Sequence, residues 1–402
     1  MTIEKTQWTA TTARTAGALA AMGAGAFCFV AMETLPVGLL PLIAGHYRVS
    51  LPDAGLLVTG YGLTVAVVSV PLAWLFRAVP RRLLLSVLLA VFAAATVASA
   101  LAPTYPLLLG ARVVVALSQS VFWAVVGPAA AGLVSAEMRG RAASIVFGGS
   151  ALAPMLGVPA GTWLGQTAGW QTAFYALAAL GLIAFVLVAA LMPASPPRTG
   201  AAAAGALPSA RRYRALTAMT VLSVGGLFAA FTFTTPFLTE ITGLDDVAIG
   251  PVLLLRGLTG LAGVIACGLL VDRRPDLVMI GSTALQAASL LGMWALAGSP
   301  VAVVACTAVS GFALGTIGPA LTARVLVVAP RSVDMAAATN SAAFNLGIAG
   351  GSYLGGAVLT LAGLRPTALV GGLVVLSALA LAIADPVLAA ADAAPEAPAA
   401  AR

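Results

Sequence analysis

Long stretches of this sequence contain no charged residue. Seven of them lie between Asp53 and Arg77, Arg82 and Arg112, Arg141 and Arg198, Arg214 and Glu240, Asp276 and Arg324, Asp334 and Arg365, and Arg365 and Asp385. A helix that spans a bilayer needs about 20 largely apolar residues, so each stretch can hold one or two spans. With only 8% charged residues in 402, the chain lacks the polar surface of a water-soluble protein. The main solvent of this chain is predicted to be lipid.

Glycine and proline divide the longer stretches and set the number of spans. Breaks are predicted at residues 102–106, 165–169 and 298–300, where these residues cluster. The twelve predicted spans are 17–41, 54–76, 83–101, 106–133, 142–164, 171–192, 215–238, 247–271, 277–297, 301–328, 335–361 and 366–384. The predicted fold class is an all-α integral membrane protein of twelve transmembrane helices.

One polar interruption divides six spans from six. Residues 193–214 combine prolines, a run of alanines and an arginine cluster, which is typical of a flexible linker. The predicted organisation is an N-terminal segment at 1–16, a six-helix bundle at 17–192, a linker at 193–214, a second bundle at 215–384 and a disordered tail at 385–402. A basic loop follows the second span and another follows the eighth, which indicates a duplicated six-helix unit.

Basic residues gather on one side of the predicted helices. With the N-terminus inside, the cytoplasmic segments contain Lys5, Arg14, Arg77, Arg81, Arg82, Arg139, Arg141, Arg198, Arg211, Arg212, Arg214, Arg273, Arg274, Arg331 and Arg402. The external loops contain Arg48 and Arg365. The positive-inside rule therefore places both termini in the cytoplasm, and the net charge of +7 reports topology, not a nucleic-acid partner. No cleavable signal peptide is evident, because Glu33 and further helix follow the first apolar run.

The sequence lacks the residues that several functional classes of protein require. An ATP-driven pump needs a lysine in a phosphate-binding loop, and Lys5 is the sole lysine. The one histidine, His46, falls in an external loop, so neither a metal site nor an enzyme is expected. Cys28, Cys267 and Cys306 fall inside spans without a CxxC pair and are interpreted as small buried hydrophobes. No cofactor is expected.

Four segments resemble the major facilitator superfamily, and within it the twelve-span drug:proton antiporter family that also contains sugar and nucleoside exporters. They are ETLPVGLLPLIA at 33–44 with AGLLVTGY at 54–61, the span around Arg112, APMLGVPAGTWLG at 153–165 with Gly169-Trp170, and GLLVDRRP at 268–275. Gln119-Ser120 stands where the family usually has His-Gly or Gln-Gly, and the loop after the second span lacks the Asp of the Asp-Arg signature. The resemblance covers nearly the whole chain. It implies two six-helix bundles that alternate access, a small-molecule substrate, a monomer, and location in a bacterial inner membrane.

Glu33 is the carboxylate deepest in a predicted span. A charge there costs about 2.5 to 3.5 kcal/mol on insertion scales and is usually functional. Glu33 and Arg112 each lie seven residues from the outer end of their spans, roughly 10 Å at about 1.5 Å per residue, and Arg256 lies at a similar depth. Either Glu33 carries the exchanged proton while Arg112 tunes it, or the two form a static ion pair.

Arg256 either faces the cavity and attracts an anionic or carbonyl-bearing substrate, or has a snorkelling or structural role. Arg324, near the inner end of its span, is expected to reach the headgroups. Aromatic, sulfur-containing and amide side chains are predicted to line a substrate cavity with Arg256, although any one aromatic residue can equally face lipid or core. They are Phe27, Phe29, Met32, Gln119, Phe122, Trp123, Phe231, Phe233, Asn340 and Asn345.

Two groups of residues are candidates for conformational gating. Gly157, Gly161 and Gly165 recur every four residues and leave one smooth helix face, predicted to slide against the other bundle while Pro154 and Pro159 bend the helix. Plain packing is the alternative. The second group consists of the loop residues Arg77, Arg81, Arg82, Asp272, Arg273 and Arg274, which form either a cytoplasmic latch or a topological anchor.

The predicted function is export of small amphipathic, antibiotic-like or drug-like molecules in exchange for protons. An apolar aromatic cavity with a few amides suits such molecules. The alternatives are an exporter of sugars, nucleosides or other metabolites, and a uniporter or channel of the same fold, because fold does not fix direction.

Overall fold

The computed structural model describes residues 2–76, 78–134, 138–193, 206–271, 273–330 and 333–393. Twelve helices in this part of the chain are long and apolar enough to cross a membrane, which confirms the predicted fold class. The first bundle consists of α1 (Thr2–Tyr47), α2 (Leu51–Leu75), α3 (Arg81–Ala100), α4 (Tyr105–Ala131), α5 (Arg139–Leu152) continued by η2 (Ala153–Gly157) and α6 (Val158–Ala168), and α7 (Trp170–Leu191).

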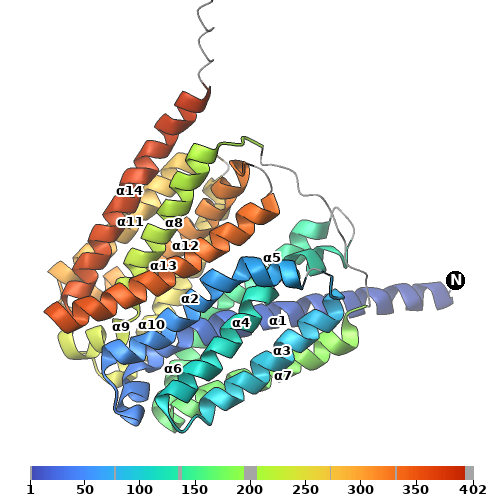
Figure 1. The fold of residues 1–402 in the computed structure, drawn as a ribbon, viewed down its shortest axis with the longest axis horizontal. Helices are drawn as coiled ribbons and strands as arrows, with labels where there is room; N and C mark the ends of the chain where they lie inside the picture. Colours follow the sequence, from blue (N-terminus) through green and yellow to red (C-terminus); the bar gives the residue numbers. More distant parts are fainter. Residues whose placement is uncertain are drawn as a thin grey trace, which may run out of the picture.

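The second bundle follows residues 194–205, which lie outside the described part. It consists of α8 (Ala210–Phe231) with the short α9 (Thr234–Pro236) and η3 (Phe237–Ile241), α10 (Asp246–Leu270), α11 (Pro275–Ala295), α12 (Pro300–Val327), α13 (Val333–Ala362) and α14 (Pro366–Ala393). Figure 1 shows the blue-to-green helices as one group and the yellow-green-to-red helices as the other.

Three predicted boundaries need correction. Helix α1 begins at Thr2 and not near residue 17, and α8 begins at Ala210, inside the predicted linker. Ser209 caps α8 by accepting from the Arg212 backbone N–H. Helix α14 continues to Ala393 through the predicted tail, because its alanine-rich sequence favours helix. Residues 394–402 lie outside the described part.

Proline accompanies a change of helix type at two places, and at one of them, the fifth span, the sequence predicts a bend. The fifth span changes from α-helix to the π-helical turn η2, which contains Pro154. Proline lacks an N–H and its ring clashes with the carbonyl four residues earlier, so the regular hydrogen-bond pattern cannot continue. A second π-helical turn, η3, follows Pro236. Both turns lie in segments that approach the opposite bundle.

Contacts between the two bundles include a set in one half of the molecule, which we call the distal half because it is remote from the start of α1 and the end of α14. Helices α2 and α13, one from each bundle, also pack against each other near their middles, at Gly62 and Asn345. The Thr235 hydroxyl donates to the Val37 carbonyl at 2.9 Å, and the Ser352 hydroxyl donates to the Gly55 carbonyl at 3.2 Å. Close to the distal loops, Gln166 Nε2 donates to the Asp246 carbonyl at 2.8 Å. We call the opposite half, which contains residues 13–27 of α1, the terminal half.

Candidate functional site

Glu33 lies in the interior of the first bundle, and only one of its two carboxyl oxygens accepts a hydrogen bond. Glu33 is 7% exposed to solvent. Gln119 Nε2 on α4 donates to Glu33 Oε2 at 2.9 Å, and the Tyr61 hydroxyl on α2 donates to Gln119 Oε1 at 2.6 Å. Glu33 Oε1 is buried and has no hydrogen-bond partner. Three helices thus hold one carboxyl group with a free oxygen.

Arg112 binds backbone carbonyls next to this carboxyl group. Its Nη1 donates to Met32 O at 3.0 Å, its Nη2 to Glu33 O at 3.5 Å, and its Nε to Leu57 O at 3.4 Å. The guanidinium carbon lies 5.1 Å from the centre of the Tyr61 ring. Among the described residues, no ion pair within 4.0 Å joins Arg112 to the Glu33 side chain. Arg112 therefore fastens α4 to α1 and α2, and the static ion pair is not formed in this conformation. We call Glu33, Tyr61, Arg112 and Gln119 the carboxyl cluster.

Arg256 lies in the second bundle, on α10, and is 5% exposed. Its guanidinium carbon lies 3.8 Å from the centre of the Phe231 ring, close enough for a cation–π interaction. Its Nε and Nη2 atoms are buried and have no hydrogen-bond partner. The next residue, Gly257, packs on η2 of the first bundle: a Cβ there would lie 2.3 Å from the Met155 Cα. Arg256 therefore sits beside the contact between the bundles.

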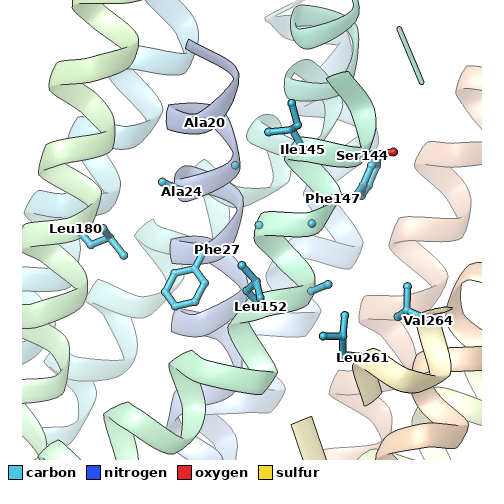
Figure 2. A pocket seen from close by; sticks show the side chains of 14 residues that line it. Ala20, Ala24, Phe27, Ser144, Ile145, Phe147, Leu152, Leu180, Leu261 and Val264 are labelled. Atoms are coloured by element: carbon cyan, nitrogen blue, oxygen red, sulfur yellow. The ribbon is translucent and has the colours of Figure 1, made fainter. Parts of the chain in front are cut away.

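An apolar groove of about 800 Å³ opens in the terminal half. It is lined by Ala20, Gly23, Ala24 and Phe27 of α1, by Ser144, Ile145, Phe147, Gly148, Gly149, Ala151 and Leu152 of α5, by Leu180 of α7, and by Leu261 and Val264 of α10. Figure 2 shows Leu261 and Val264 across the groove from the α1 and α5 residues. The groove therefore lies between α1 and α5 of the first bundle and α10 of the second, in the terminal half.

The predicted cavity residues are distributed over several environments, and Phe27 is the one that lines this groove. Phe29 and Phe122 pack with Phe92 in the first-bundle core, where Met32 is also buried. They do not line the groove, because helix periodicity does not distinguish a core-facing side from a cavity-facing one. Trp123 stacks on the groove residue Phe147 with ring centres 5.9 Å apart.

The residues of the second bundle that were predicted to line the substrate cavity are also buried. Phe233 fills the space beside Gly55 and Gly355, between the bundles. Asn340 accepts from Thr220 and donates to Thr322. Asn345 donates to the Ser341 carbonyl, while its side-chain oxygen is buried without a partner.

The glycine face of the fifth span packs against α1 of its own bundle, and the prediction that it slides against the other bundle is wrong in this conformation. A Cβ at Gly157 would lie 3.0 Å from Ala31 and Phe27, one at Gly161 would lie 2.3 Å from Leu35, and one at Gly165 would lie 2.3 Å from Leu39. The opposite bundle is met instead by the Pro154 carbonyl and Met155, against Gly257. Near the distal end, Pro159 lies 4.0 Å from the Cβ position of Gly250.

Two of the described loop arginines, Arg81 and Arg82, stabilise helix ends. Arg81 donates to the Pro128 carbonyl at 2.8 Å and Arg82 to the Ala189 carbonyl at 2.5 Å. Cations at helix C-termini satisfy free carbonyls and the helix dipole. These contacts lie within the first bundle. Arg273 and Arg274 are exposed, whereas Arg77 and Asp272 lie outside the described residues.

A charge network at the terminal end of the second bundle was missed by the sequence reasoning. Arg212 binds Asp385 with Nε to Oδ1 at 2.9 Å and Nη2 to Oδ2 at 3.0 Å. Arg324 binds Asp385 at 3.1 Å and Asp276 at 2.7 Å, so its predicted reach to the headgroups is wrong. We call these four residues the terminal charge network; it joins α8, α11, α12 and α14. The signal available in the sequence was that two acidic and two basic residues lie near the ends of four different predicted spans.

Comparison with known proteins identifies the family. The model of the Major Facilitator Superfamily matches residues 22–280. The chain belongs to the major facilitator superfamily. It is 36% identical to the uncharacterized MFS-type transporter YtbD of Bacillus subtilis (strain 168), over 90% of this chain and 94% of that protein. It is 30% identical to a probable sugar efflux transporter of Mannheimia succiniciproducens, over 87% and 89%.

The fold agrees with a solved structure of the superfamily. A bacterial homologue of the human lysosomal transporter Spinster, solved in an inward-facing and unoccupied conformation, has a TM-score of 0.70 and 16% identity, over 96% of this chain and 99% of that one. At this identity the likeness shows the fold alone. This major facilitator superfamily protein is thus a multi-pass membrane transporter, and such transporters bind small-molecule substrates within the membrane.

Proposed function

We propose that this transporter exports small amphipathic organic molecules in exchange for protons, and that Glu33 carries the proton. The observation that supports this most is the free oxygen of a buried carboxyl group that has no ion-pair partner among the described residues. Burial of an unpaired carboxylate is costly, and a proton on Oε1 relieves that cost. Gln119 and Tyr61 position the group, and Arg112 holds the helices around it.

The proposed orientation places both termini in the cytoplasm of a bacterium, following the distribution of basic residues. The distal half is then external. Because the bundles touch there and the groove lies in the terminal half, we infer that this conformation is closed to the outside and that its groove faces the cytoplasmic side. We propose that the protein works as a monomer.

The groove supports amphipathic substrates more than sugars. Its lining residues are apolar or glycine except for Ser144, so binding depends mainly on removal of apolar surface from water. Export of a sugar is the second candidate, favoured by the similarity to a probable sugar efflux transporter. Exchange of one proton for a neutral solute is driven by about 2.3 kcal/mol per 100 mV of membrane potential, in addition to the pH gradient.

The test is proton release from proteoliposomes that contain a pH-sensitive dye. Antibiotics, sugars and nucleosides are added in turn to wild type, Glu33→Gln and a control, Gln286→Leu. Gln286 is a buried glutamine of α11 that donates to the Ser223 carbonyl, in the other bundle. We expect an amphipathic compound to evoke release in wild type and the control, and none in Glu33→Gln. Flux without proton movement, unchanged in Glu33→Gln, would identify a uniporter.

A further inference from the structure

Arg256 presents two free hydrogen-bond donors in a nearly closed environment. The Nε and Nη2 atoms lack partners, while one face of the guanidinium is covered by Phe231 at 3.8 Å. Buried charged groups are normally paired, because leaving a buried donor unsatisfied is costly. A ligand that visits the site during the transport cycle would explain why this arginine is kept free.

The same chain shows what this pair of atoms binds. In Arg212, Nε and Nη2 donate in parallel to the two carboxylate oxygens of Asp385, at 2.9 and 3.0 Å. This two-pronged arrangement matches the spacing of carboxylate oxygens. Arg256 offers the identical pair of donors with nothing bound to them.

Among the acidic residues of the second bundle whose side chains the structure describes, none is found paired with Arg256. None of the described ion pairs includes Arg256. Asp246, at the start of the same helix, lies ten residues away, about 15 Å along α10 at about 1.5 Å per residue. Asp276 and Asp385 are bound in the terminal charge network, and Glu240 is exposed.

We infer that Arg256 is the recognition site for the carboxylate of an amphipathic organic acid, with Phe231 as its aromatic platform. A single fixed cation balances a single negative charge, which favours a monocarboxylate over a doubly charged phosphate monoester. The apolar part of such a molecule matches the apolar lining of the groove. This inference rests on the proposed transport function and narrows its substrate class.

The site is closed in this conformation, because the free nitrogens are buried. Next to it, Gly257 is packed against Met155 and the Pro154 carbonyl of the other bundle. Entry of a carboxylate therefore requires α10 to shift relative to η2. Substrate binding would in this way be linked to the movement of one bundle against the other.

The test measures the melting temperature of the purified full-length protein in neutral detergent. The probes are benzoate and 1-naphthoate, each compared with its uncharged amide, and phenyl phosphate. The variants are Arg256→Lys, which keeps the charge but loses the paired donors, and Arg256→Gln. Arg365→Gln is the matched control, since Arg365 also lies over an aromatic ring, Trp294, but is exposed and distal.

We expect the carboxylates, and not the amides, to raise the melting temperature of wild type, Arg365→Gln and Glu33→Gln. Arg256→Lys should need roughly tenfold more benzoate, Arg256→Gln should not respond, and phenyl phosphate should act more weakly than benzoate. Absence of any response to carboxylates, an equal response to the amides, or an unchanged response in Arg256→Lys or Arg256→Gln overturns the inference. A stronger response to phenyl phosphate overturns the choice of carboxylate.

This result is separable from that of the proton-exchange assay. Arg256-dependent binding of benzoate in Glu33→Gln supports the inference whether or not Glu33 proves to carry the proton. Conversely, loss of proton release in Glu33→Gln with no carboxylate response supports the exchange mechanism and removes the organic acid as its substrate.

Discussion

Gln119 is the residue through which the first bundle orients Glu33. It accepts from Tyr61 and donates to Glu33, so one amide fixes the position of the carboxyl group relative to two neighbouring helices. A hydrogen bond to a charged group contributes about 1.5 to 3 kcal/mol. Loss of the hydrogen bond from Gln119 is expected to change how readily Glu33 binds and releases its proton, while the packing around Glu33 is retained.

The substitution Gln119→Leu is expected to reduce substrate-evoked proton release roughly tenfold or more without loss of the folded protein. The reason is that Glu33 Oε2 then loses its side-chain partner. Proton release is measured in proteoliposomes and folding by size-exclusion chromatography. Gln286→Leu also removes one buried hydrogen bond of a side-chain amide, and this variant should release protons as wild type does. Equal activity in the two variants would contradict a role for Gln119.

Asp385 is the residue most important to the terminal charge network. Its side chain is 1% exposed and pairs with both Arg212 and Arg324. Asp385→Asn removes the buried negative charge that binds both arginines, so we expect a destabilisation of about 3 to 5 kcal/mol. Thermal unfolding in detergent measures the effect.

Asp276→Asn is the control for that experiment. It removes a bond of the same Arg324, but the Asp276 side chain is 46% exposed, so the expected cost is below about 1 kcal/mol. A similar cost for the two variants would show that the network does not depend on burial.

At the scale of the element, α10 meets the other bundle at a position without a side chain. A Cβ at Gly257 would lie 2.3 Å from the Met155 Cα and 2.8 Å from the Pro154 carbonyl oxygen. These are backbone atoms of η2, which cannot move aside as a flexible side chain would. The π-helical turn and Gly257 therefore form a close backbone contact between the fifth span and α10.

Gly257→Ala is expected to reduce transport roughly tenfold, because the bundles cannot close to the observed distance. Gly268→Ala, on the same helix with no atom within 4 Å of its Cβ position, should transport normally. The distance between spin labels on α6 and α10 should increase in the first variant and not in the second. An unchanged distance would show that the contact is not required for closure.

The elements also show what could be predicted from the sequence. Charge-free stretches predicted the spans well, because charge is excluded from lipid wherever a helix lies. The spacing of Gly157, Gly161 and Gly165 correctly indicated a smooth face but not its neighbour, which is α1. Likewise, Arg212 and Asp385 are 173 residues apart, and no local pattern reports that they meet. The alanine-rich end of α14 looked like a tail because Asp385 was interpreted as the end of the membrane span.

At the scale of the whole molecule, closure of the distal half defines the conformation. Pro52 and Gly356 come from different bundles, and a Cβ at Gly356 would lie 3.6 Å from the Pro52 Cβ. This separation suits a disulfide bond. The pair therefore offers a reversible lock on the closed distal half.

The double substitution Pro52→Cys and Gly356→Cys, with Cys28, Cys267 and Cys306 replaced by alanine, is expected to abolish transport under oxidising conditions. Reduction should restore it, because the bundles can then separate distally. Each single cysteine variant should remain active under both conditions. Transport that continues in the cross-linked protein would contradict alternation through separation of the distal half.

The most direct test of Glu33 as the proton carrier compares exchange with net transport in Glu33→Gln. Proteoliposomes are loaded with a substrate identified in the dye assay. Exchange of labelled for unlabelled substrate is measured without a gradient, and accumulation is measured with a pH gradient. The account predicts that the variant retains exchange and loses pH-driven accumulation, because binding and bundle movement persist without a proton. Accumulation equal to wild type would contradict it and assign Glu33 a structural role.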